Sequence, residues 1–217
     1  MELSVWKSVI SHSSRWYRAC SVWRQLWKLS CPSKIKIFAW KALHGCLPCF
    51  VILANKHIPI DGVNCPRCLT EAEDIKHVPF TCSRAKDVWL ALGVWEEIER
   101  MLMVDRSGSI VIEEIIRTGG LSKEFNNIGR SELIITGCWY IWWQRRRVVH
   151  GEDIQTPTRA AMSIAAIATN NALAPKASAV INKKWQKPVE GFLMINVDGS
   201  FDETRGIGST GAVIRDA

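Results

Sequence analysis

The chain has 217 residues, of which 47% are hydrophobic and 23% charged, a composition typical of globular domains and not of disordered chains. No stretch approaches the roughly 18 apolar residues of a membrane span, and the N-terminus lacks the regions of a secretion signal. We therefore expect an intracellular, non-secreted protein without a membrane partner. The net charge of +7 is concentrated in residues 1–60, where nine lysines and arginines stand against one acid, which favours a polyanionic partner such as nucleic acid.

Apolar residues at helical spacing predict the first helices. They form one stripe over residues 19–29, after which Cys31 and Pro32 interrupt the chain. In the next helix Pro32 suits the first turn, and Gly45 suits the C-terminal end. The apolar face of that helix consists of Ile35, Phe38, Ala39, Ala42 and Leu43, whereas Lys34, Lys36 and Lys41 project elsewhere. A third, short helix is expected at about residues 48–56.

Further helices are predicted after a loop that is rich in cysteine. Ser83 can cap a helix that Gly93 closes, with Ala85, Val88, Trp89 and Leu92 as its apolar face. Residues 96–130 are mixed, with a short helix near residues 110–117 and a Gly119-Gly120 breaker. The first ninety-odd residues therefore resemble a small helical unit wrapped around a Cys/His loop.

A longer helix is expected from Ser131 to about Val149. Its buried face would contain Ile134, Cys138, Ile141 and Trp142. The basic run 145–147 suits the negative end of the helix dipole, so a structural role is at least as favoured as phosphate contact. A second, alanine-rich helix opens at Thr156-Pro157 and stops at Pro175.

The periodicity changes near the C-terminus. Leu193, Ile195 and Val197 alternate with other side chains, which predicts a strand with one apolar face; the alternating residues are Met194, Asn196 and Asp198. A glycine-bearing segment, residues 199–211, then precedes a second strand at residues 212–214. The C-terminal residues therefore predict a β-hairpin.

Four candidate metal ligands lie within eighteen residues, in the pattern Cys65-x2-Cys68-x8-His77-x4-Cys82. A CxxC knuckle lets two thiolates chelate a metal from one turn, and a second pair of ligands completes a closed tetrahedron. Thiolate and imidazole suit zinc, and four protein ligands leave no open position for catalysis. The spacing is therefore typical of a structural zinc site.

Two alternatives to zinc remain open for these residues. Cys65 and Cys68 have the form of a redox dithiol, although the acidic run of residues 71–74 would disfavour a thiolate there. The side chains could also be buried without metal. Pro79 disfavours a regular helix across His77 and Cys82 unless it lies in the first turn. The cysteines without such spacing are expected in the core: Cys20, Cys31, Cys46, Cys49 and Cys138.

The run from Val22 to Trp89 resembles the zinc-binding module that follows the polymerase in plant non-LTR (LINE-type) retrotransposon reverse transcriptases. The shared positions are Trp23 and Trp27, Pro32-x-Lys34, Phe38-x-Trp40, Leu47-Pro48, the Cys/Cys/His/Cys set and Ala85-x-x-Val88-Trp89. Pro79 departs from the bulky apolar residue usual at its position. The run CWYIWWQRRRVVHGE is similar to the next segment of that family, and residues 192–217 are similar to the opening hairpin of an RNase H-like domain.

This resemblance implies a mainly α fold with a C-terminal β-hairpin from an incomplete RNase H-like α/β domain. The implied parts are a zinc-binding domain at 16–95, a helical connector at 96–174, a linker at 175–190 and a truncated RNase H-like domain at 191–217. Asp198 matches the first catalytic acid of that domain, a Mg²⁺ ligand, but the other acids of the family have no counterpart in this chain. We therefore expect Asp198 to be vestigial, and Mg²⁺ to matter only in a complete domain.

The predicted function is a non-catalytic, zinc-stabilised, nucleic-acid-associated fragment of a retrotransposon polyprotein, nuclear by resemblance. Its candidate phosphate contacts are Arg15, Arg18, Arg24, Lys34, Lys36 and Lys41, which would give salt-dependent binding with little sequence preference. One alternative is a ribonuclease H that cleaves RNA in RNA:DNA hybrids, with the chain incomplete. Another is a protein-interaction scaffold that binds no nucleic acid. The choice of RNA or DNA and the oligomeric state stay open.

Overall fold

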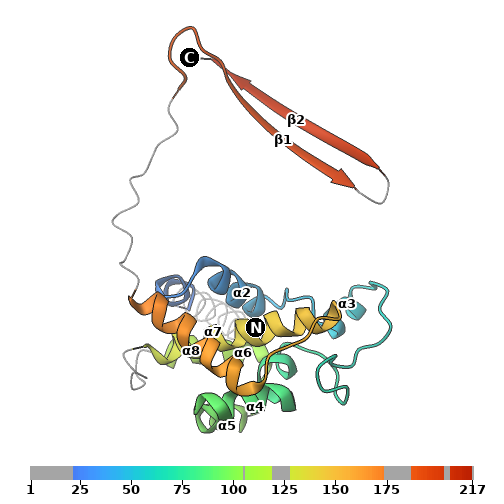
Figure 1. Ribbon diagram of the computed structural model, residues 1–217, viewed down its shortest axis with the longest axis vertical. Coiled ribbons are helices and arrows are strands. Elements are labelled where there is room, and N and C mark those ends of the chain that lie inside the picture. Colours follow the sequence, from blue (N-terminus) through green and yellow to red (C-terminus); the bar gives the residue numbers. More distant parts are fainter. Residues whose placement is uncertain (1–21, 105, 119–127, 174–186, 203–205, 217) are drawn as a thin grey trace, which may run out of the picture. The chain divides into compact units, whose positions relative to one another are not determined.

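The computed structural model describes residues 22–104, 106–118, 128–173, 187–202 and 206–216. The predictions for Arg15, Arg18, Cys20, the Gly119-Gly120 breaker, Pro175 and most of the linker lie outside these residues. The chain divides into two compact units, Met1–Ala174 and Pro175–Ala217. The first unit is helical and the second contains a pair of strands (Figure 1).

In the described part of the first unit, residues 22–28 are helical and are followed by α2 (Ser33–Leu43). Pro32 is the N-cap of α2 and lies just before its first turn, one position earlier than predicted. The predicted apolar face is buried except for Leu43, which is partly buried. Gly45 follows with φ +65°, a left-handed conformation that commonly ends a helix. α3 (Phe50–Asn55) is shorter than the predicted helix.

A π-helical turn, η1 (His77–Thr81), leads directly into α4 (Ser83–Leu92). The backbone N–H of Cys82 donates to the carbonyl of His77, five residues earlier, at 2.8 Å. Pro79 is the third residue of the turn, where its missing N–H removes no bond of the turn. Pro79 thus lies in the first turn, the exception that the prediction allowed, and the segment is a π-helical turn and not a regular α-helix. Cys82, and not Ser83, is the N-cap of α4, whose predicted apolar face is buried.

Two helices cover residues 95–118: α5 (Trp95–Leu102) and α6 (Gly108–Thr118). The sequence analysis did not predict α5, of which only Ile98 is buried, and it placed α6 two residues too late. Gly108 contacts the backbone of the loop before η1, since an added Cβ would lie 2.4 Å from the carbonyl carbon of Ile75. Glycine is therefore required at the start of α6.

The long helix α7 (Arg130–Val149) packs against α2, α6, η1 and α8 (Pro157–Leu173) (Figure 1). Residues on every side of α7 are buried, including the four that were predicted, which is expected of a helix surrounded by others. Gly137 lies against Trp89 of α4, and an added Cβ would approach the indole ring to 2.4 Å. The core of this unit therefore extends over segments far apart in sequence.

The second unit contains β1 (Met194–Asp202) and β2 (Ile207–Arg215), which pair antiparallel in the register Val197↔Ala212. β1 extends to Asp202 and β2 begins at Ile207, so both strands reach into residues 199–211, which were predicted to lie between the strands. Gly199 pairs with Thr210, because the absence of side chains does not prevent backbone pairing. Among the described apolar side chains of this hairpin, Met194 is partly exposed and the others are exposed, Val197 to 69%. The prediction of a mainly α chain with a C-terminal β-hairpin is confirmed.

Candidate metal centre

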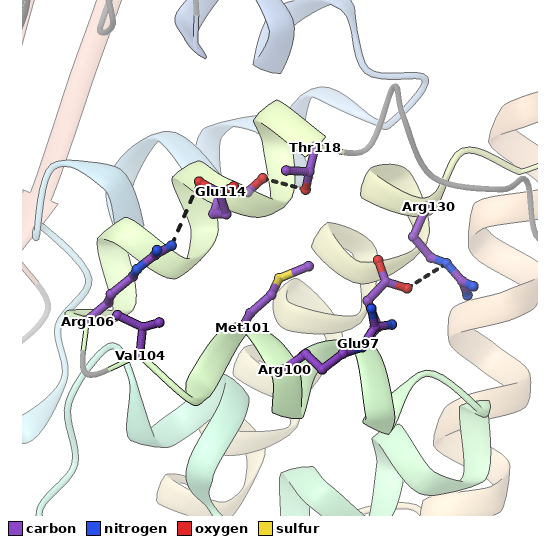
Figure 2. A pocket seen from close by; sticks show the side chains of 8 residues that line it. All are labelled: Glu97, Arg100, Met101, Val104, Arg106, Glu114, Thr118 and Arg130. Carbon is purple, nitrogen blue, oxygen red and sulfur yellow. Dashed lines mark hydrogen bonds and ion pairs between the residues drawn. The ribbon is translucent and has the colours of Figure 1, made fainter.

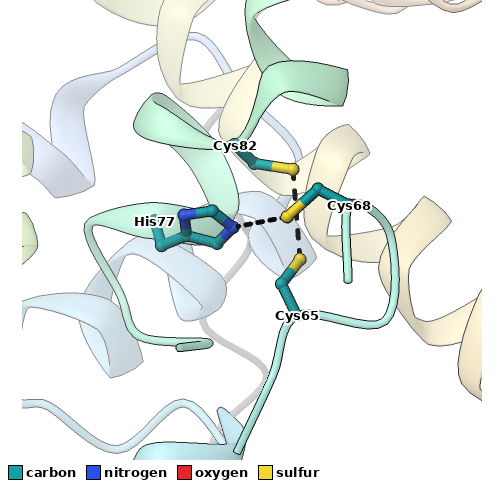
Figure 3. A group of neighbouring side chains, drawn as sticks. All are labelled: Cys65, Cys68, His77 and Cys82. Carbon is teal, nitrogen blue, oxygen red and sulfur yellow. Dashed lines mark hydrogen bonds between the residues drawn. The ribbon is translucent and has the colours of Figure 1, made fainter. Parts of the chain in front are cut away.

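The structure brings Cys65, Cys68, His77 and Cys82 together, and Figure 3 shows their side chains converging. One candidate ligand atom of each lies within 4.8 Å of all the others. The Sγ atoms of Cys65 and Cys82 are 3.9 Å apart, and Sγ of Cys68 lies 3.3 Å from Nε2 of His77. A tetrahedral zinc with Zn–S bonds of about 2.3 Å would place two sulfurs about 3.8 Å apart. The donor set and its spacing therefore fit zinc.

The loop that carries the first two cysteines folds back on itself. The N–H of Cys65 donates to the carbonyl of Glu71 at 2.7 Å, and the N–H of Leu69 donates to the carbonyl of Cys65 at 2.8 Å. Leu69 takes a left-handed conformation, with φ +63°, and Asn64 and Ala72 form an antiparallel bridge. The turn thereby directs both thiols of the CxxC pair toward His77.

The imidazole of His77 is held with Nε2 toward the cysteines. Its Nδ1 lies 3.0 Å from Oε2 of Glu71 and 3.2 Å from Oγ1 of Thr81. A carboxylate at Nδ1 favours the tautomer that leaves Nε2 free for a metal, and raises the basicity of that nitrogen. Asp74 accepts the N–H of His77 at 2.6 Å and so fixes the start of η1.

The pKa values of these groups are shifted by their mutual contacts. Burial lowers the pKa of His77, but hydrogen bonds with Cys65 and Cys68, together with the charge of their thiolates, raise it to about 9. The hydrogen bond between Cys65 and Cys82 raises the pKa of Cys65 to about 11, with burial adding to it, and lowers the pKa of Cys82. Burial opposes a lower pKa of Cys68, yet hydrogen bonds with Thr70 lower it. A metal must therefore displace protons from this cluster.

The comparisons with known proteins agree with this geometry. Residues 3–89 match the family described as zinc-binding in reverse transcriptase. The matched segment contains all four cluster residues, and the resemblance to a reverse-transcriptase zinc-binding module is confirmed.

A second similarity extends over most of the chain. The chain is 24% identical over 203 residues to an Arabidopsis thaliana protein named "Putative ribonuclease H protein At1g65750". The alignment covers 88% of this chain and 31% of that protein, so the chain spans about a third of the length of this relative. No solved structure matches the chain.

A buried ion pair connects the zinc-binding segment to α7. Glu73 is fully buried, and Arg145 is 5% exposed. Nη2 of Arg145 donates to Oε2 of Glu73 at 2.6 Å, while Nε donates to Oε1 in a second, parallel contact. The N–H of Phe50 also donates to Oε2 of Glu73, at 3.0 Å. Arg145 therefore has a structural role, because its charge neutralises Glu73, one of the acids that follow the CxxC pair.

The sequence analysis missed this pair and described residues 71–74 only as unfavourable to a thiolate. Glu73 and Arg145 are 72 positions apart, so no local pattern could connect them. Their residue types carry a weak signal, because a buried carboxylate needs a partner. Glu71 and Asp74 were likewise missed as partners of His77.

The predicted phosphate contacts differ in their surroundings. Arg24, Lys34 and Lys41 are exposed, the first on the helix over residues 22–28 and the others on α2. Lys36 is partly buried, and its Nζ donates to the carbonyl of Trp27 at 2.9 Å. This bond satisfies a carbonyl near the end of the first helix, so Lys36 has a structural partner.

Asp198 and the remaining cysteines are not members of the Cys/His cluster. Asp198 is exposed on β1 and accepts the N–H of Gly199 at 2.9 Å. Among the described residues, the Cys/His group is the one cluster that could hold a metal ion. Asp198 belongs to no such cluster of carboxylates there. Cys49 and Cys138 are buried as predicted, but Cys46 is exposed, because it follows the end of α2.

Proposed function

We propose that the chain is a zinc-stabilised, nucleic-acid-associated segment of a retrotransposon polyprotein and is itself non-catalytic. The observation that carries the proposal is the closed Cys₃His cluster, whose four protein ligands leave no position for a substrate or water. Zinc bound there would add its binding free energy to the stability of the helical unit. We also propose a nuclear location, in line with the kind of element that the family match indicates.

The proposed partner is nucleic acid. The excess of lysine and arginine in residues 1–60 supports it, because such a charge attracts the phosphate backbone irrespective of sequence. The family match and the name of the Arabidopsis relative are consistent with a role on nucleic acid. Binding of this kind would weaken steeply as salt concentration rises.

Metal analysis of the purified full chain tests the zinc proposal. We expect about one zinc per chain, since one cluster supplies four ligands. Cys68→Ser should lose the zinc together with helical circular dichroism, whereas Cys46→Ser, which changes an exposed cysteine outside the cluster, should retain both. A chain that is fully helical after complete metal removal would overturn the proposal.

A ribonuclease H activity is the second candidate, favoured by the similarity to the Arabidopsis protein and by the place of Asp198 on β1. We expect no cleavage when the chain is incubated with a labelled RNA:DNA hybrid and Mg²⁺. Cleavage of the RNA strand that Asp198→Asn abolishes would instead establish the enzyme.

A further inference from the structure

A groove of about 470 Å³ lies between α2 and α7, on the helical unit. Phe38 and Trp142 pack beneath it, with ring centroids 6.4 Å apart. Lys34 and Lys41 line it from α2, and Trp139 and Arg146 line it from α7. Basic side chains from two helices therefore surround one concave, partly aromatic surface.

The described residues that line this groove leave its positive charge unbalanced. None of them carries a carboxylate, and the cation of Arg145 at its base is already paired with Glu73. Lys41 and Arg146 are exposed and form no ion pair in the described parts of the chain. Nζ of Lys34 lies 4.6 Å from the centroid of the Trp139 ring, so a positive charge is held against an aromatic face. The groove therefore offers sites for anions beside a ring.

A pocket of similar size gives a useful contrast. Figure 2 shows side chains from α5, α6, the segment between these helices and the start of α7 around a pocket of about 480 Å³. There the arginines face acids: Arg130 lies 2.8 Å from Glu97, and Arg106 lies 3.9 Å from Glu114. Those charges are largely balanced within the protein, so that pocket has less attraction for an anion than the α2–α7 groove.

We propose that the α2–α7 groove binds single-stranded nucleic acid, with Lys34, Lys41 and Arg146 at its phosphates. A basic groove with an accessible aromatic side chain is the usual combination for single strands, since every base has a face that can stack. Trp139 provides that face when Lys34 moves to a phosphate. A duplex would contact only the rim, because its bases are already stacked. The inference rests on the proposed nucleic-acid function and gives it a location and a substrate class.

The test measures binding to the zinc-loaded full chain by fluorescence anisotropy. The labelled probes are oligo-dT and oligo-U of twelve nucleotides and a DNA duplex. The groove variant Lys41→Glu/Arg146→Glu reverses two exposed charges. Its matched control, Lys56→Glu/Arg159→Glu, makes the same charge change at exposed residues outside the groove. We expect at least about tenfold weaker binding of both single strands by the groove variant, and a salt dependence shallower by roughly 0.7 per lost phosphate contact.

The outcomes separate this inference from the function on which it rests. Loss of binding in the groove variant, with the control close to wild type and zinc content unchanged, supports the groove. Equal losses in both variants, or wild-type binding in both, overturn the groove while nucleic-acid association stands. A wild-type chain that prefers the duplex to the single strands overturns the substrate class. Failure of the zinc-loaded wild type to bind any of the probes overturns the proposed function itself.

Discussion

Removing the cation of the buried Glu73–Arg145 pair should strongly destabilise the helical unit. In Arg145→Met the side chain keeps much of its volume, but the Glu73 carboxylate loses two charge-assisted hydrogen bonds, each worth about 1.5–3 kcal/mol. Among the described residues, the N–H of Phe50 then remains as the hydrogen-bond donor to this carboxylate. Breaking a buried ion pair on one side typically costs about 3–5 kcal/mol, and we expect a loss in that range.

Urea unfolding of the zinc-loaded chain, followed by circular dichroism, measures this loss. Arg146→Met is the matched control, because it makes the same change one residue along α7 at an exposed position and should stay within about 0.5 kcal/mol of wild type. The double variant Glu73→Gln/Arg145→Met should recover part of the loss, since no unpaired charge is left buried. A loss below about 1 kcal/mol in Arg145→Met would refute the reasoning. So would a double variant whose loss of stability equals the sum of the losses in Glu73→Gln and Arg145→Met.

Three further predictions concern the metal centre and the core around it. Glu71→Gln should weaken zinc binding about 10–100-fold in chelator competition, because Nδ1 of His77 loses its carboxylate partner; unchanged affinity would contradict that role. The pKa of about 9 for His77 means that metal-free imidazole is protonated below that pH, so apparent zinc affinity should rise with pH between neutral and about 9. Zinc titrations that are flat over this interval would count against it. Gly137→Ala should cost about 1–3 kcal/mol in urea unfolding, because the new methyl group overlaps the ring of Trp89, and a neutral effect would show that α4 and α7 can separate freely.

The sequence predicted those features whose signals are local. The four cluster residues lie within eighteen positions, so their spacing alone indicated a common metal, and Gly93 ends α4 as its left-handed φ of +74° allows. α5 was missed because a short helix with only Ile98 buried has almost no apolar stripe to detect. The two strands of the hairpin were predicted too far apart in the sequence, because glycines weaken the alternation of apolar and polar residues that identifies a strand.

The contacts that connect distant segments could not be predicted from one sequence. Lys36 was grouped with phosphate contacts because its charge is visible in sequence, whereas its bond to the carbonyl of Trp27 depends on how two helices meet. The α2–α7 groove brings together Lys34 and Lys41, which were predicted as phosphate contacts, and Arg146. For Arg146 a structural role was at least as favoured as phosphate contact. Such groupings follow from tertiary packing and leave no periodic trace.

The contacts that α7 makes with the Cys/His loop and α4 have a consequence for how the matched segment can be exchanged between proteins. The family match ends at residue 89, but Glu73 and Trp89 both contact α7, which begins at Arg130. A recombination event that transplanted residues 3–89 alone would carry the ligands into a new protein together with a bare carboxylate and an uncovered indole. We therefore expect the inheritable unit to include α7, so that the metal-binding loop and its distant helix are gained, lost or exchanged together.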